Sequence, residues 1–257
     1  MKIATPVSHL FDTQESARVI TELSDCLELR EQNISFKSEK VELFHCDLEP
    51  TKKWKTKDQQ FIYEVISQHP NLQLISFHLA SCYEAPVTKD FMFLPGGNKL
   101  NVCQMKQNAQ VNLQFMKENF EHLSFAIENN NYYPTDAYEY ICNPHFINEI
   151  VNDNNLYFLL DIAHAKISAH NLNLPFYEYM HALPLSKIIQ IHITGYQDTE
   201  KGRIARDEHL YPSKDNWSTV KKIISRHREN LRYLTVEYYS DYEKLLQAIT
   251  ELKQKIQ

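Results

Sequence analysis

Short apolar runs alternate with longer helical patterns from one end of the chain to the other. The eight runs lie at 2–7, 26–31, 41–47, 72–80, 122–129, within 156–165, at 187–194 and at 231–239. Helical patterns lie at 13–23, 57–68, 103–119, 174–183, 215–229 and 240–256, and another ends near residue 152. This alternation is typical of βα units around a parallel sheet. Since a single (β/α)8 barrel takes ~250 residues, we predict one α/β TIM-barrel domain over residues 1–257.

The sixth run, LYFLLDIAHA, ends in a carboxylate and an imidazole. Its apolar part suits a strand that is buried on both faces, as strands of parallel sheets are. Burying Asp161 and His164 at its end would be costly without a partner or a metal ion. The two residues therefore indicate a functional site.

Alternate residues within the runs differ in polarity. In 187–194, Ile189, Ile191 and Ile193 share one face, and Gln190 and His192 share the other. Successive side chains of a strand point to opposite faces. We therefore expect the apolar face to pack under the helices and the small or polar face to line the barrel axis.

The strand ends carry residues of the types that bind metals. In chain order, and with the nearby loop residues included, they are His45, His78, Glu128, Asp161, His164, His192, Asp207, His209 and Glu237. Such barrels place their catalytic residues at the C-terminal ends of the strands, so these side chains should meet at one mouth. Imidazoles and carboxylates in this ratio suit zinc, manganese or iron. The set exceeds what one ion can use, so we expect two or three divalent ions, bridged by Glu128 or Glu237.

Other residues allow more than one interpretation. A lone histidine on a strand is more often a satisfied core residue than a ligand, but recurrence at successive strand ends favours a site. His170 either contacts substrate or is structural. The aromatic side chains of the loop after 122–129 either line a pocket above the metals, which we favour, or pack the loop: Tyr132, Tyr133, Tyr138 and Tyr140. The loop 81–100 is long enough to be a lid or a binding loop.

Composition argues against several classes of protein. The net charge of −6 disfavours a nucleic-acid partner, because phosphate binding needs a basic face. The sequence holds only 4 glycines, with neither GxGxxG nor a P-loop, and no run approaches the length of a membrane span, so we expect no membrane association. Five cysteines without CxxC spacing fit free thiols in a reducing compartment. We therefore predict a cytoplasmic protein.

The ordered set of strand-end residues resembles the xylose-isomerase-like barrel superfamily. Glu128, Asp161, His192 and Glu237 are similar to the common metal core of that superfamily. One branch, the endonuclease IV family of trizinc DNA phosphodiesterases, has signatures that resemble FHLAS, IEN, LDIAHA, HIT and DEH of this chain. This likeness implies, as an alternative function, a metal-dependent phosphodiesterase that cleaves abasic-site DNA.

A second resemblance, to the DUF692 family of multinuclear non-heme iron-dependent oxidases, covers nearly the whole chain. It is carried by CLELREQN (through Glu28, Glu31 and Asn33), SFHLAS, ENNNYY, LLDIAHAKISAHN, PLSKIIQIHITGY, DEHLYPSKDNW and TVEYY. It implies an oxidase that uses O2 to modify a peptide, often at cysteine, or a small molecule. The catalytic residues that hold the central ion or ions would be Glu128, Asp161, His192 and Glu237. One flank would consist of His45 and His78, and the other of His164, Asp207 and His209.

The chain departs from this family's pattern in two ways. His164 stands where most of these oxidases have asparagine, which brings the site nearer to the endonuclease IV pattern. The chain is also short and poor in glycine, so a module that grips a peptide substrate would be a separate partner protein. A sugar isomerase or epimerase with one divalent metal, and Glu128 and Glu237 as acid and base, is a further alternative. A non-catalytic metal-binding scaffold is the fourth hypothesis, after the oxidase, the phosphodiesterase and the isomerase.

Overall fold

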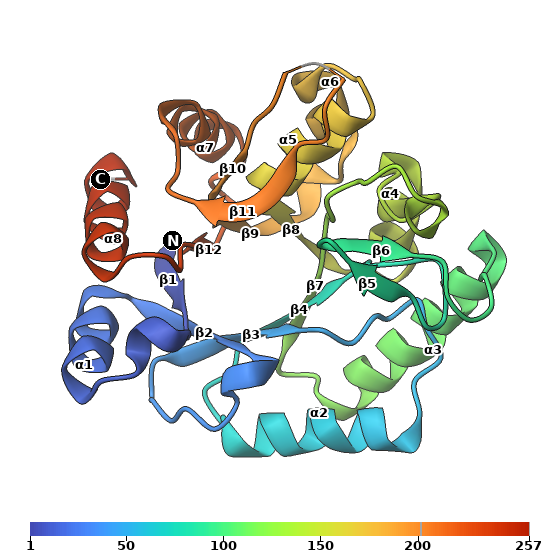
Figure 1. The fold of residues 1–257 in the computed structure, drawn as a ribbon. Coiled ribbons are helices and arrows are strands. Elements are labelled where there is room, and N and C mark those ends of the chain that lie inside the picture. The colour runs from blue at the N-terminus through green and yellow to red at the C-terminus, as the bar shows by residue number, and fades with distance from the viewer. Residues whose placement is uncertain (201, 257) are drawn as a thin grey trace.

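The computed structural model describes residues 1–200 and 202–256, and eight parallel strands form a closed barrel at its centre (Figure 1). The order around the barrel is β1, β12, β9, β8, β7, β4, β3 and β2. These strands span Lys2–Pro6 (β1), Cys26–Arg30 (β2), Val41–Cys46 (β3), Leu74–His78 (β4), Ser124–Glu128 (β7), Tyr157–Asp161 (β8), Ile188–Ile193 (β9) and Tyr233–Val236 (β12). The predicted TIM barrel is therefore confirmed.

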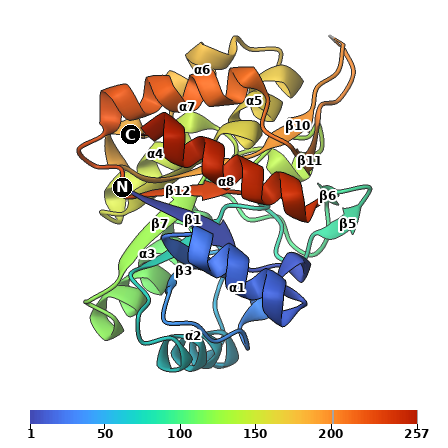
Figure 2. The ribbon, with the colours of Figure 1, turned by 90° about the vertical axis from the view of Figure 1, so that its left-hand side faces the viewer.

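Helices surround the strands on the outside of the barrel (Figures 1 and 2). They are α1 (Gln14–Leu23), α2 (Thr56–Gln68), α3 (Val102–Asn119), α4 (Pro144–Asp153), α5 (Ile162–Asn171), α6 (Phe176–Ala182), α7 (Lys214–His227) and α8 (Tyr242–Ile256). Residues 31–40 contain only the 3₁₀ turn Glu31–Asn33, so β2 and β3 are joined without an α-helix. In the described part of the chain, no helix combines the length and the apolar character needed to cross a bilayer.

Helix α5 begins directly where β8 ends, and the sequence of this helix has no amphipathic pattern that would predict it. Asp161 is the N-cap, and its Oδ1 accepts a hydrogen bond from the backbone N–H of His164 at 2.7 Å. Residues 162–169 are all buried, so the helix has no polar face for a periodicity to show. His164 therefore stands in the first turn of a buried helix that the sequence analysis did not predict.

One apolar residue from each strand closes the inside of the barrel below the mouth. This interior layer consists of Ala4, Cys26, Leu43, Leu74, Ala126, Leu159, Ile189 and Tyr233. The expectation that Ile189 faces the helices is wrong, because the register of β8 against β9 shifts after Phe158. Phe158 pairs with Ile188 and Leu159 with Gln190, so the extra residue, Ile189, joins the interior layer.

Two antiparallel hairpins stand at the mouth end of the barrel (Figure 2). The loop 81–100 forms β5 (Val87–Lys89) and β6 (Met92–Leu94), and the segment after β9 forms β10 (Gly195–Gln197) and β11 (Arg206–Leu210). Asp207 and His209 therefore lie on a strand, whereas the sequence analysis expected them in a loop.

Candidate metal centre

The barrel strands bring six polar side chains to the mouth. Each belongs to the last three residues of its strand or follows the strand directly: His45 (β3), His78 (β4), Glu128 (β7), Asp161 (β8), His192 (β9) and Glu237 (after β12). Sheet register aligns them in pairs, since His78 is opposite Glu128 and Asp161 is opposite His192. All are buried except His78, which is 24% exposed.

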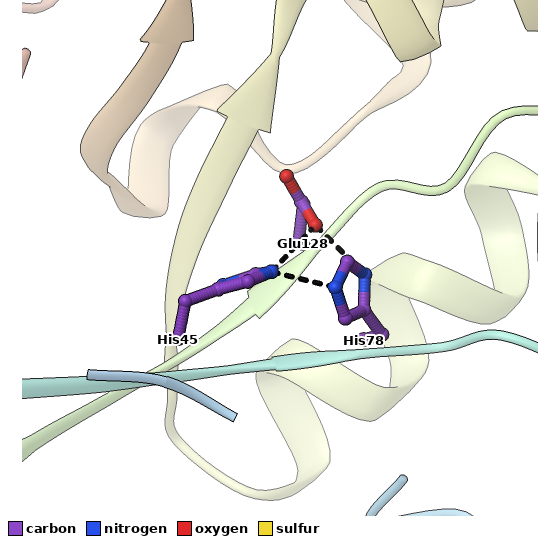
Figure 3. Close-up of side chains that lie close together, drawn as sticks. All are labelled: His45, His78 and Glu128. Atoms are coloured by element: carbon purple, nitrogen blue, oxygen red, sulfur yellow. Dashed lines mark hydrogen bonds and ion pairs between the residues drawn. The ribbon is translucent and has the colours of Figure 1, made fainter. Parts of the chain in front are cut away.

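The first group of donors consists of His45, His78 and Glu128 (Figure 3). The Nε2 atoms of the two imidazoles lie 2.6 Å apart. Glu128 Oε2 lies 3.3 Å from His45 Nε2 and 2.9 Å from His78 Nδ1. The other ring nitrogen of His45 lies 2.7 Å from Ser76 Oγ, which fixes the ring.

The second group consists of Glu128, Asp161 and His192. His192 Nδ1 lies 3.0 Å from Glu128 Oε1, 4.0 Å from Asp161 Oδ2 and 3.2 Å from Glu237 Oε2. Asn129 holds Asp161 in place, because its side chain accepts from the Asp161 N–H and donates to the Asp161 carbonyl, each at 2.9 Å. Glu128 turns one oxygen to each group and so lies between them.

The remaining donors, His164, Asp207 and His209, form a third group. His164 Nε2 lies 3.1 Å from Asp207 Oδ2, and His209 Nδ1 lies 3.6 Å from Asp207 Oδ1. His209 Nε2 lies 3.7 Å from Glu237 Oε1, so Glu237 lies between this group and the second one. His209 has a φ of 45°, a left-handed conformation that histidine adopts more readily than most residues.

The position of β11 depends on close packing at Gly195. A Cβ on this residue would lie 2.5 Å from the carbonyl oxygen of Tyr211 and 2.9 Å from that of Leu210. Only glycine lets β10 approach β11 this closely. The pairing of the two strands in turn places Asp207 and His209 at the mouth.

Three buried donor atoms, Glu128 Oε2, Asp161 Oδ2 and His192 Nδ1, form no hydrogen bond of acceptable geometry with the described residues. Glu128 Oε2 is turned toward the imidazoles of the first group, and the other two atoms belong to the second group. A buried polar atom without a partner costs about 1–3 kcal/mol. The carboxylate and imidazole donors fit divalent cations such as zinc, manganese or iron, and cations bound in these two groups would compensate the three atoms.

Burial and neighbouring charges shift the pKa values of this site in opposite directions. Burial raises the pKa of Asp161 to about 7, against the effect of His164 and with reinforcement from the carboxylates Glu128 and Glu237. Burial acts in the same direction on Glu128, but the imidazoles of His45 and His78 hold its pKa well below the usual range. One carboxyl group of the cluster thus retains a proton near neutral pH while its neighbour is ionised.

Sequence reasoning gave no role to two further side chains at the mouth. Glu28 is completely buried, and its Oε2 lies 3.1 Å from His192 Nε2. The guanidinium of Arg30 pairs with Glu28 Oε1 at 2.9 Å and also with Glu237. The period of two along β2 could have revealed them, because Cys26, Glu28 and Arg30 point to the same face of the strand and Cys26 belongs to the interior layer.

A cavity of about 540 Å³ opens above the donors and is of the size of a small-ligand site. Besides six of the donors, its lining includes Arg30, Asp47, Glu49, Phe93, Asn130 and Asn131. His170 lines a different cavity, next to Arg203. The four tyrosines are not among the lining residues of the mouth. Tyr133 and Tyr138 are buried against each other with ring centroids 5.6 Å apart, so loop packing is the correct interpretation for these two.

The fold and the chain's family define the class of protein. Residues 51–257 match the family described as RiPP precursor modification enzyme MbnB/TglH/ChrH. The match covers more than half of the chain, and the chain therefore belongs to this family. The predicted family resemblance is confirmed.

Curated relatives match shorter parts of the chain. A UPF0276 protein of Caulobacter vibrioides (strain NA1000 / CB15N) is 31% identical over 101 residues, which are 39% of this chain and 35% of that protein. A UPF0276 protein of Vibrio vulnificus (strain YJ016) is 26% identical over 130 residues, or 49% of this chain and 44% of that protein. The chain thus spans less than half the length of either relative.

Solved structures show the same fold at low sequence identity. Endonuclease IV from Thermus thermophilus superposes with a TM-score of 0.64 at 11% identity, covering 100% of this chain and 99% of that one. The 3-keto-D-glucoside 4-epimerase YcjR from E. coli gives a TM-score of 0.62 at 14% identity, with 100% and 99% covered. A xylose isomerase domain protein from Salmonella typhimurium also gives 0.62, at 11% identity, with 100% and 97% covered. These likenesses show a xylose-isomerase-like barrel.

Replacing Asp161 with asparagine tests the electrostatics of the metal-free protein. The folded chain binds more protons at Asp161 than the unfolded chain between pH 3.8, the ordinary pKa, and about 7. The free energy of unfolding of the wild type therefore falls as the pH rises through this interval. Above about pH 7, where Asp161 is ionised in both the folded and the unfolded chain, it falls no further on account of this group. The free energy of unfolding of Asp161→Asn, measured by urea denaturation, should increase relative to that of the wild type between about pH 4 and about pH 7. Asp12→Asn, at an exposed position, is the control for the removal of one carboxyl group, and a pH-independent difference for Asp161→Asn would contradict this account.

Proposed function

We propose that the chain is an enzyme that oxidises a ribosomally synthesised precursor peptide with two or three iron ions held at the barrel mouth. The family to which it belongs modifies such precursors, which supports a peptide substrate. One observation carries the metal-dependent part of the proposal. Three adjacent groups of donors share Glu128 and Glu237, and three buried atoms of Glu128, Asp161 and His192 form no hydrogen bond of acceptable geometry with the described residues.

The donors divide into a centre and two flanks. Glu128, Asp161, His192 and Glu237 would hold the central ion or ions. His45 and His78 would complete one flank with Glu128, and the other flank would use His164, Asp207 and His209. Iron bound by imidazole and carboxylate donors supplies one-electron and O2 chemistry.

The rest of the mouth would admit and orient the substrate. His78 and His209 are 24% and 34% exposed, whereas His45 and His192 are fully buried. A side chain of the peptide would therefore meet the flanks first. Phe93 and Asn131 offer it an apolar contact and an amide in the cavity wall. The apolar interior layer below excludes water from the opposite side of the donors.

A second candidate function is a metal-dependent phosphodiesterase of the endonuclease IV type. It is favoured by His164, whose imidazole lies 3.1 Å from Asp207 and so completes a third group of donors. The net charge of −6 and the acidic lining residues Asp47 and Glu49 disfavour a DNA substrate, because a phosphate backbone would be repelled. A sugar isomerase with one metal would leave the flank donors without a role.

Metal content distinguishes these functions. Protein purified without oxygen should contain two or three iron ions per chain, and the ferrous protein should consume O2 when it is exposed to air. Elemental analysis beside iron spectroscopy and an oxygen electrode would measure this. A protein that holds only zinc and cleaves abasic-site DNA under nitrogen would overturn the oxidase proposal in favour of the phosphodiesterase.

Replacing His209 with alanine should remove about one ion and leave the others. His209 is at the exposed edge of its flank, and its partners Asp207 and Glu237 remain in the variant. Elemental analysis gives the stoichiometry, and circular dichroism reports the fold. Glu208→Ala, at the exposed neighbouring position of β11, is the matched control and should keep the full complement. Loss of all ions or of the fold in His209→Ala would contradict the shared arrangement.

A further inference from the structure

His192 lies between carboxylates on both sides of its ring. Its Nδ1 atom faces the donors of the centre, with Glu128 Oε1 at 3.0 Å and Glu237 Oε2 at 3.2 Å. Its Nε2 atom faces away from them and lies 3.1 Å from Glu28 Oε2. The amide nitrogen of Gln190 also lies 3.1 Å from Nε2, but it donates to Glu28 Oε2 and Thr235 Oγ1, which takes up its two hydrogens. The two nitrogens therefore have different surroundings, and only Nδ1 is on the side of Asp161.

The carboxylate of Glu28 is held in place next to His192 Nε2 by further contacts. Its Oε2 also accepts a hydrogen bond from the amide of Gln190, which in turn donates to Thr235 Oγ1 at 2.8 Å. Its Oε1 pairs with Arg30 at 2.9 Å. Glu28, Gln190, His192 and Thr235 are 0% exposed, and the side chain of Arg30 is 16% exposed. The carboxylate thus has no freedom to turn away from Nε2.

A neutral imidazole has one N–H, and the partner of that N–H decides which nitrogen is left as the ligand. A carboxylate at Nε2 favours the proton on Nε2, and the lone pair is then on Nδ1. Nδ1 instead faces Glu128, Glu237 and Asp161, the carboxylates that would hold an ion with it, and none of its contacts with them has hydrogen-bond geometry. An ion bound among these carboxylates would need the lone pair of Nδ1, and the proton would then lie on Nε2, next to Glu28.

We propose that Glu28 is a positioning residue that fixes the Nε2–H tautomer and the ring orientation of His192, so that Nδ1 is presented to the ion shared with Glu128 and Asp161. This inference rests on the proposed metal site. Carboxylate partners of this kind commonly orient metal-binding histidines. The competing explanation is that Glu28 serves only as the counter-ion of Arg30, which already has Glu237 as a second partner.

The test compares Glu28→Gln with a matched loss of charge at the other end of the barrel. Glu42 on β3 pairs with Lys2, far from the donors in the strand register, so Glu42→Gln is the control. Metal-free proteins would be titrated with Co²⁺, whose absorption reports binding, and circular dichroism would confirm the fold. Glu28→Gln should weaken the binding of one ion about tenfold to a hundredfold, while Glu42→Gln binds as the wild type does.

A measurement on the wild type keeps the inference testable if Glu28→Gln does not fold. In zinc-loaded protein with ¹⁵N-labelled histidine, NMR should show His192 ligated through Nδ1 and protonated at Nε2. Ligation through Nε2, or unchanged Co²⁺ affinity in folded Glu28→Gln, would overturn the role of Glu28 and leave the metal site standing. A wild-type protein that binds neither ion would instead overturn the proposed function, and this inference with it.

Discussion

The burial of opposed charges at one end of the barrel is the constraint on which the other features of the site depend. Glu128, Asp161 and His192 each present a buried atom that has no hydrogen-bond partner in the described part of the chain. Neighbouring imidazoles stabilise some of the carboxylates, but burial still raises the pKa of Asp161 to about 7. Cations bound among these donors would compensate the buried atoms.

The fold supports this arrangement through contacts that leave little freedom. Sheet register aligns Asp161 with His192, and the side chain of Asn129 clasps the backbone of Asp161 from the next strand. Gly195 lets β10 and β11 pair closely, and this pairing positions Asp207 and His209 at the mouth. Rigid supports of this kind are what a site needs in order to hold several ions at fixed positions.

The barrel and the strand-end residues could be predicted because both follow from regular patterns, namely a period of two and the C-terminal ends of strands. The failures occurred where the pattern breaks. A register shift sends Ile189 into the barrel, and α5, which carries His164, is buried on every side and has no amphipathic signal. The contacts of Glu28 and Arg30 join β2 to residues more than 160 positions away, and spacing along the chain cannot show them.

The most direct test of a shared multi-ion centre is anomalous X-ray diffraction at the iron edge from crystals of the anaerobically purified protein. The account predicts two or three separate iron peaks at the barrel mouth, one of them in contact with Glu128, Asp161 and His192. A single peak, or no peak among these three side chains, would contradict it.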